Sequence, residues 1–283
     1  MGESLLITLR EGFEAALIVA IVLAAVRKSP DPGQARWVWA GTAAAIALSI
    51  VFGIIIHLTI DDLRGEARLR TFAVICIGAA GLLTWMILWM RSHSRHLKAE
   101  LEGKTLSAMN QSSLALASVA FLAVSREGLE TALFLISGTT ANSPQDVVIG
   151  GLIGLALAVV LGVAVYHGSR VFPVRRFFQI TGVLIIILAA GLLSRGIMFL
   201  QISGDLGTFN NAFYDLTQYE WLTVSTQSGR FLGGIFGWDP RPSIEQVVVY
   251  LGFTAGALFL FFREPGPRER DVRPVVTTNS ELT

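Results

Sequence analysis

The sequence predicts an all-α polytopic membrane protein with seven transmembrane helices, arranged as two inverted three-helix repeats plus a seventh helix. Three observations predict this fold. The 283-residue chain is 53% hydrophobic and 15% charged, whereas soluble domains carry about 25% charged residues. Seven apolar segments are long enough to cross about 30 Å of hydrocarbon. One charged pentapeptide occurs twice, in the first and the fourth of these segments.

The seven segments follow one another with short polar connections. The first lacks a basic region before it and a small-residue cleavage pattern after it, so we interpret it as a retained span and not a signal peptide. The seventh is the shortest. The predicted spans are 4–26, 37–58, 71–90, 109–138, 147–166, 177–200 and 246–262.

The distribution of Lys and Arg predicts the orientation in the cytoplasmic (inner) membrane. Fourteen of these residues flank one side of the spans and five flank the other. Because basic residues accumulate in cytoplasmic loops, the N-terminus is expected outside and the C-terminus in the cytoplasm. The net charge of +1 gives no reason to expect a nucleic-acid partner.

Two regions fall outside the predicted repeats and the seventh span. Residues 201–245 form one long external loop, in which we expect an interfacial helix near 210–222 and a turn at 233–240. The tail 263–283 has a Pro-, Arg- and Thr-rich composition that is typical of a disordered segment. The only cysteine, Cys76, lies in mid-span, so no disulfide framework is expected.

A duplication connects the two halves of the chain. The charged motif recurs at an offset of 116, and the sequence Ala-Ala-Gly-Leu-Leu at 79–83 recurs at 189–193. The repeats are therefore expected at 1–107 and 108–200. Since each holds three spans, an odd number, the halves insert in opposite directions, which is an arrangement typical of transporters.

The charged motif is Arg-Glu-Gly-x-Glu. At 100° per residue its arginine and both glutamates share one helix face, while the glycine points away. Each charge costs about 3 kcal/mol at mid-bilayer, so these side chains should be paired, turned inward and functional. Two such faces together carry four carboxylates and two guanidinium groups, a net charge of −2, which favours a small cation. The predicted metal ligands are Glu11, Glu14, Glu127 and Glu130, shaped by Arg10, Arg126, Gly12 and Gly128.

Ligand chemistry narrows the ion to the hard cations, because carboxylate oxygens prefer them. The histidines fall at span ends or in loops, and Met86, Met90 and Met198 are not expected to cluster with the motifs. This argues against copper(I) or zinc. The motif glycines allow two interpretations, either close helix packing or a local kink. No catalytic residue and no organic cofactor is predicted.

Four further residues are candidates for a path outside the motifs. Glu3 falls on the motif face of the first span, although an exposed N-terminal glutamate is the simpler expectation. Arg195, near the outer end of the sixth span, either pairs with a glutamate or snorkels to the interface, and snorkelling is favoured. Asp215 and Glu220 in the long loop are expected to be a solvated face.

Two Arg-Glu-x-x-Glu motifs in the first and fourth of seven spans resemble the high-affinity iron permeases, the family of the fungal oxidase-coupled permeases and the bacterial EfeU type. The resemblance implies uptake of iron, Fe²⁺ or Fe³⁺, as the transported substrate, with Glu11, Glu14, Glu127 and Glu130 carrying the ion. It also implies a periplasmic iron-binding protein and a haem peroxidase as partners, beside membrane lipid.

Two alternatives remain open. A proton-coupled transporter of another divalent cation would use the same glutamates as proton relays. A membrane-embedded di-iron oxidase is disfavoured, because helical di-iron sites use Glu-x-x-His pairs, and here a glutamate occupies the position three residues after Glu11 and after Glu127.

Overall fold

The computed structural model is all-α in the residues that it describes. These residues are 1–27, 32–61, 63–93, 103–109, 112–140, 142–167, 174–207, 212–223 and 225–263. The long helices are α1 (Gly2–Arg27), α2 (Ala35–Asp61), α3 (Gly65–His93), α5 (Ser113–Gly138), α6 (Pro144–Tyr166), α7 (Val174–Ile202) and α9 (Ile244–Phe262). The shorter elements are η1 (Pro32–Gln34), a helix at 103–109, η2 (Glu220–Leu222) and α8 (Gln227–Phe236).

The seven predicted spans all coincide with long helices. Five of these, as far as the described residues go, are long and apolar enough to cross a membrane: Ala35–Ile60, Gly65–Met90, Pro144–Tyr166, Arg176–Ile202 and Ile244–Phe262. The helices α1 and α5 are as long, at 26 residues each, but they contain the charged motifs. The fourth span is shorter than predicted, because Ser112 accepts a hydrogen bond from Ala115 N and caps α5 there.

Local sequence explains where several helices begin. Ser143 caps α6, whose first residue is Pro144, a residue suited to that position because its missing N–H would be unpaired there. Ser243 and Gln246 form a reciprocal capping box at the start of α9. The αL conformation of Gly65, with φ of 61°, allows the sharp turn between α2 and α3.

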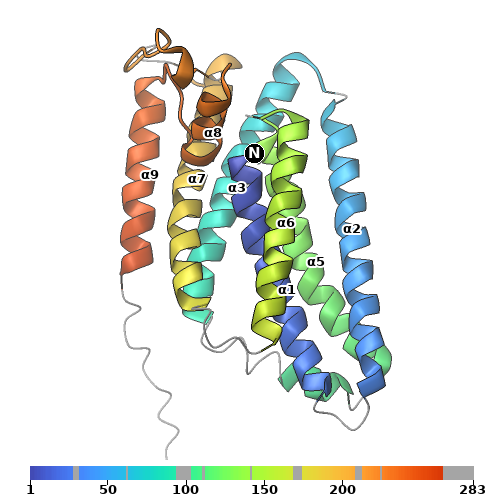
Figure 1. Ribbon diagram of the computed structural model, residues 1–283. Coiled ribbons are helices and arrows are strands. Elements are labelled where there is room, and N and C mark those ends of the chain that lie inside the picture. Colours follow the sequence, from blue (N-terminus) through green and yellow to red (C-terminus); the bar gives the residue numbers. More distant parts are fainter. Residues whose placement is uncertain are drawn as a thin grey trace, which may run out of the picture.

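The helices form two packed groups (Figure 1). In one group α1 packs along α6, α2 packs along α5, and α1 crosses α5; in the other, α3 packs along α7, which also contacts α9. Large apolar side chains on the outer faces of α2, α6 and α9 are exposed, as in Ile50, Val160 and Phe259. Such faces suit lipid contact, and the charged helix α1 lies within the bundle.

Close approaches between helices recur in matched pairs. Gly12 of α1 faces Ala158 of α6, and Gly128 of α5 faces Ser49 of α2. Gly128 follows Gly12 by 116 positions, the interval at which the charged motif recurs. Their contact partners, Ser49 and Ala158, are 109 positions apart. Two more sets of contacts show the same two intervals. The contact of Gly41 with Ala117 matches that of Gly150 with Met1, and the contact of Gly53 with Ala132 matches that of Gly162 with Ala16.

The long loop differs from its prediction. No helix occupies the described residues of 210–222 apart from the single turn η2, because Asp215 accepts hydrogen bonds from Thr217 and fixes a local turn. The helix instead is α8, which Thr226 caps and Gly237, with φ of 64°, ends. The turn predicted at 233–240 therefore begins only after Phe236. Of the tail 263–283, all but Arg263 lies outside the described residues.

Candidate metal centre

The first motif lies in the uninterrupted helix α1. Arg10, Glu11 and Glu14 are all buried, with 2%, 0% and 7% of their surfaces exposed. The Arg10 Nη1 atom lies 3.6 Å from Glu11 Oε1, and Arg10 Nε lies 3.1 Å from Glu14 Oε1. Neither contact has hydrogen-bond geometry. Arg10 is thus a buried counter-charge shared by both carboxylates of its own motif.

The second motif is arranged differently around its arginine. Arg126 Nε donates a hydrogen bond to Glu130 Oε1 at 3.0 Å. The Arg126 side chain is 39% exposed, and its guanidinium carbon lies 4.9 Å from the centre of the Trp89 ring, a cation–π contact. Glu127 is buried, at 5% exposed. The second motif therefore holds Glu130 in a pair and leaves Glu127 turned inward.

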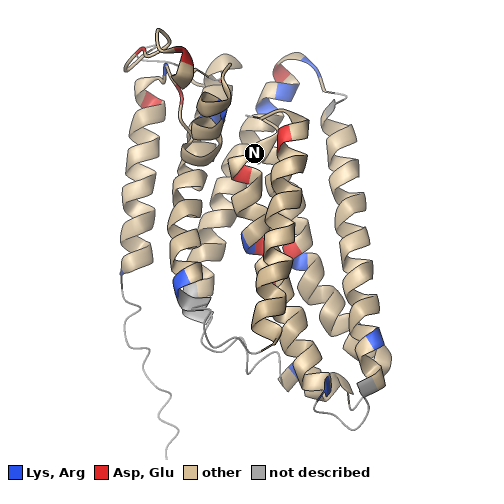
Figure 2. Ribbon diagram, in the orientation of Figure 1, with Lys and Arg blue, Asp and Glu red and all other residues tan. Residues whose placement is uncertain are grey.

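The two motifs meet between α1 and α5. Ligand oxygens of Glu11, Glu14 and Glu127 all lie within 4.8 Å of one another. Glu130 does not belong to this group of three, and its Oε1 atom accepts a hydrogen bond from Arg126. Figure 2 shows acidic and basic positions gathered near mid-height of the bundle, between ends that are richer in charge.

Several polar atoms of this cluster lack partners. Both carboxylate oxygens of Glu11 and one oxygen each of Glu14, Glu127 and Glu130 are buried without a hydrogen bond to any described residue. A buried, unpaired carboxylate costs several kcal/mol, and two arginines balance only two of the four charges. A bound cation would supply both the missing charge and the missing ligation.

The spacing of the oxygens suits one small ion. Carboxylate oxygens bind small divalent metals at about 2.0–2.2 Å, so two ligands of one ion lie at most about 4.4 Å apart. The limit of 4.8 Å in the cluster is slightly larger. The three carboxylates therefore lie close to the spacing that a shared small ion requires.

The motif glycines provide close packing and not a kink. Both α1 and α5 are continuous helices through the motif. A Cβ atom at Gly12 would lie 2.9 Å from Ala158 Cβ, and one at Gly128 would collide with Ser49. The glycine turns away from the carboxylates. Each motif therefore packs its back against a neighbouring helix, α6 for α1 and α2 for α5, while its charged face meets the other motif.

One further residue contacts the motifs, contrary to expectation. The sulfur of Met90, at the end of α3, lies 3.7 Å from Arg10 Nη2. The expectation that Met90 does not cluster with the motifs is therefore wrong, since neither helix alone indicates that the Met90 side chain reaches Arg10. The thioether contacts the arginine and not a carboxylate, so the acidic ligand set is unchanged.

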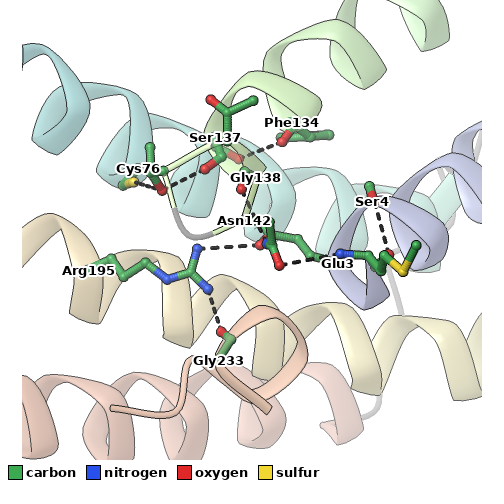
Figure 3. Close-up of polar contacts among 12 residues, drawn as sticks. Glu3, Ser4, Cys76, Phe134, Ser137, Gly138, Asn142, Arg195 and Gly233 are labelled. Atoms are coloured by element: carbon green, nitrogen blue, oxygen red, sulfur yellow. Dashed lines mark hydrogen bonds and ion pairs between the residues drawn. The ribbon is translucent and has the colours of Figure 1, made fainter. Parts of the chain in front are cut away.

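Glu3 and Arg195 form a second buried pair (Figure 3). Glu3 is 1% exposed, so the expected exposed N-terminal glutamate is wrong. Arg195 Nη1 lies 3.4 Å from Glu3 Oε2, and Arg195 Nη2 donates to the carbonyl of Gly233. Of the two alternatives for Arg195, pairing is confirmed and snorkelling is not.

Asp215 and Glu220 do not assemble into a site. Asp215 binds Thr217 and lies 3.6 Å from Arg241, and its hydrogen bonds with Thr217 lower the pKa of its carboxyl. Glu220 is an exposed residue of η2. Within the described part of the chain, the only group of three or more potential metal-ligating side chains is the one formed by Glu11, Glu14 and Glu127.

Comparison with known proteins gives a consistent result along the chain. The family model for the iron permease FTR1 family matches residues 1–261. A ferrous iron permease EfeU from Yersinia pestis is 33% identical over 263 residues, which cover 92% of this chain and 93% of the relative. A ferrous iron permease EfeU from Escherichia coli O6:K15:H31 is 34% identical over 270 residues, 92% of this chain and 95% of the relative. No solved structure matches the chain.

Proposed function

The chain belongs to the iron permease FTR1 family, and we propose that it carries ferrous iron across the cytoplasmic membrane through the carboxylate cluster of α1 and α5. Family membership makes the protein an iron-transporting membrane permease and not an enzyme, which removes the di-iron oxidase alternative. The ion, its site and its path are the subject of the proposal.

The observation that carries the proposed site is the convergence of Glu11, Glu14 and Glu127 within 4.8 Å. Their unpartnered oxygens favour a hard cation. Ferrous iron is the choice among such cations because the similar permeases of Yersinia pestis and Escherichia coli are named for it. Glu130 then serves as a reserve ligand, which becomes available when its hydrogen bond with Arg126 breaks.

The proposed transmembrane arrangement has seven spans. The helices α1 and α5 join the five apolar ones because each is 26 residues long, about 39 Å at 1.5 Å per residue. Four of their motif charges, those of Arg10, Glu11, Glu14 and Glu127, are buried in the bundle. The bias of Lys and Arg supports an external N-terminus and a cytoplasmic C-terminus. The end of the bundle that carries α8 is then the external end.

The matched contact pairs support two inverted repeats, 1–107 and 108–200. Three separate contacts of the α1 segment with α6 recur between α5 and α2 under the same offsets, a relation that chance apolar packing would not produce. A pseudo-two-fold axis relating the halves would pass between the two motifs. A mid-membrane site on such an axis suits alternating access, in which one half rocks against the other.

The test is uptake of radioactive iron, supplied as Fe²⁺, by cells that express the protein. Separate Glu11→Ala, Glu14→Ala and Glu127→Ala variants should each lose nearly all uptake at matched expression, and Glu130→Ala should lose less. Asp205→Asn, which changes an exposed carboxylate paired with Arg70, serves as the control and should transport normally. Normal transport by all four glutamate variants would exclude the proposed site.

A competition experiment addresses the remaining alternative, a proton-coupled transporter of another divalent cation. An excess of Mn²⁺, Mg²⁺ or Ca²⁺ should reduce iron uptake only weakly if the site is selective for iron. Strong flux of one of these ions without iron flux would favour the alternative. The implied partners, a periplasmic iron-binding protein and a haem peroxidase, belong to the proposal as suppliers of the ion at the external end.

A further inference from the structure

A second buried polar cluster lies at the end of the bundle where α1 begins, beneath α8 (Figure 3). It joins Glu3 of α1, Arg195 of α7, the carbonyl of Gly233 of α8 and Asn142. The amide oxygen of Asn142 accepts a hydrogen bond from the N-terminal amine at 3.3 Å. Four segments far apart in the sequence thus meet around the Glu3–Arg195 pair.

The Glu3 carboxylate is under-coordinated in this cluster. Among the described residues its Oε2 atom pairs with Arg195, at a long 3.4 Å, and its second oxygen, Oε1, is buried without a hydrogen bond to any residue that the structure describes. Gly138 and Gly234 leave room beside it, since a Cβ at Gly138 would lie 3.7 Å from Oε1. The surroundings offer further oxygen atoms from Asn142 and the Gly233 carbonyl.

Glu3 lies directly in line with the mid-membrane cluster. It precedes Arg10 by seven residues, so it occupies the same face of α1 about 10 Å closer to the α8 end. Glu3 and the Arg10–Glu14 pair therefore lie about two helical turns apart on one face of α1.

Among the residues that the structure describes, this cluster has no counterpart at the opposite end of the bundle. The repeat offsets relate Glu3 to Val119 of α5 and Arg195 to Trp85 of α3, so the opposite end has apolar side chains at both positions. The pair is therefore not a remnant of the duplication. It marks one end of the path, and the orientation proposed above makes that end the external one.

We propose that Glu3 is an outer cation site, through which ferrous iron passes to the mid-membrane cluster, and that Arg195 occupies this site as an internal counter-ion when iron is absent. The inference rests on the proposed transport function. When the ion arrives, the Arg195 guanidinium releases Glu3 and keeps its hydrogen bond to the Gly233 carbonyl. Glu3, Asn142 and water then ligate the ion.

The test compares two neutralising variants in an Fe²⁺ uptake assay over a range of concentrations. Arg195→Gln removes the competitor, so the half-saturating iron concentration should fall about fivefold or more. Glu3→Gln removes the ligand and leaves an unpaired guanidinium that repels the ion, so the same concentration should rise by a similar factor. If the ion pair is purely structural, both variants should shift the half-saturating iron concentration in the same direction. That result would overturn the outer site.

Two additional variants keep the result decisive. The double variant Glu3→Gln/Arg195→Gln has no charge imbalance and should fold even if a single variant does not. Because it lacks the Glu3 ligand, its half-saturating iron concentration should still be raised. A wild-type value would refute the proposal. Arg70→Gln is the matched control, because Arg70 also pairs across elements, with Asp205 at 2.7 Å, but on an exposed surface. It should leave the half-saturating concentration unchanged.

The assay separates this inference from the proposed function. Absence of Fe²⁺ uptake by the wild-type protein would reject the transport function itself. Wild-type uptake that Glu14→Ala abolishes, together with shifts in the same direction for Glu3→Gln and Arg195→Gln, would reject the outer site alone.

Discussion

Gly12 and Ala158 lie in direct contact where α1 crosses α6, on the side of α1 that faces away from the carboxylates. A Cβ atom at Gly12 would lie 2.9 Å from Ala158 Cβ, closer than such atoms approach in folded proteins. The motif glycine therefore sets the distance between two helices, and through it the position of Glu11 and Glu14.

Gly12→Ala is expected to destabilise the protein by about 1–3 kcal/mol, because the added methyl group overpacks the crossing. The double variant Gly12→Ala/Ala158→Gly should recover most of this loss, since the space removed on one helix is returned on the other. Thermal unfolding in detergent measures both. A double variant no more stable than Gly12→Ala would show that this contact does not determine the crossing.

Gly41 and Gly53 offer a matched comparison on α2. A Cβ at Gly41 would collide with the backbone carbonyl of Ala117, whereas one at Gly53 would lie at an ordinary 3.6 Å from Ala132 Cβ. Gly41→Ala should therefore destabilise the protein, and no change of the Ala117 side chain should rescue it. Gly53→Ala should be neutral or stabilising by up to about 1 kcal/mol, because alanine favours the helix. Equal melting temperatures for the two variants would contradict this interpretation.

The two motif arginines should differ in their contribution to stability. Arg10 is 2% exposed and contacts two carboxylates, so Arg10→Gln leaves uncompensated buried charge and should cost about 3–5 kcal/mol. Arg126 is less enclosed, with 39% of its side chain exposed, and it pairs with Glu130 alone, so Arg126→Gln leaves less uncompensated buried charge and should cost less than Arg10→Gln. Thermal unfolding in detergent compares the two, and a larger effect at Arg126 would refute the ranking. Addition of Fe²⁺ should stabilise Arg10→Gln more than the wild type.

The convergence of the carboxylates is predictable from sequence because it follows from the helical period and the recurrence of the motif. Glu14 follows Glu11 by three positions, on the same helix face, and Glu127 follows Glu11 by 116, the interval at which the motif recurs. The same reasoning does not separate Glu130 from the others, since both motifs have identical patterns. The two motifs differ in that the Arg126 guanidinium lies over the Trp89 ring, a contact between helices with no signature in either segment.

The incorrect expectations have a common physical origin in long-range contacts. An exposed Glu3 is the natural expectation because the N-terminus of a chain usually is exposed, and its burial depends on Asn142, Arg195 and Gly233. The aromatic residues near 210–222 give a stronger apolar signal than the Gly-rich segment that forms α8, so sequence patterns favour the wrong segment of this loop. A Thr226 N-cap followed by a Gly237 C-cap is the available local signal for the true helix.

The anchoring of α8 yields a final prediction. Gly191 of α7 packs against the backbone of Gly237, the residue that ends α8, and a Cβ at Gly191 would lie 2.5 Å from Gly237 Cα. Gly191→Ala should therefore push α8 away from α7 and open the cover over Glu3. Its repeat counterpart, Gly81, has no described atom within 4 Å of the place where a Cβ would stand, so Gly81→Ala is the matched control. Hydrogen–deuterium exchange of residues 227–236 should rise about tenfold or more in Gly191→Ala, an opening easier by about 1.4 kcal/mol, and stay unchanged in Gly81→Ala. Equal exchange in both variants would mean that α8 is held by its other contacts, such as the Arg230–Asp146 pair at 3.7 Å, and not by this glycine pair.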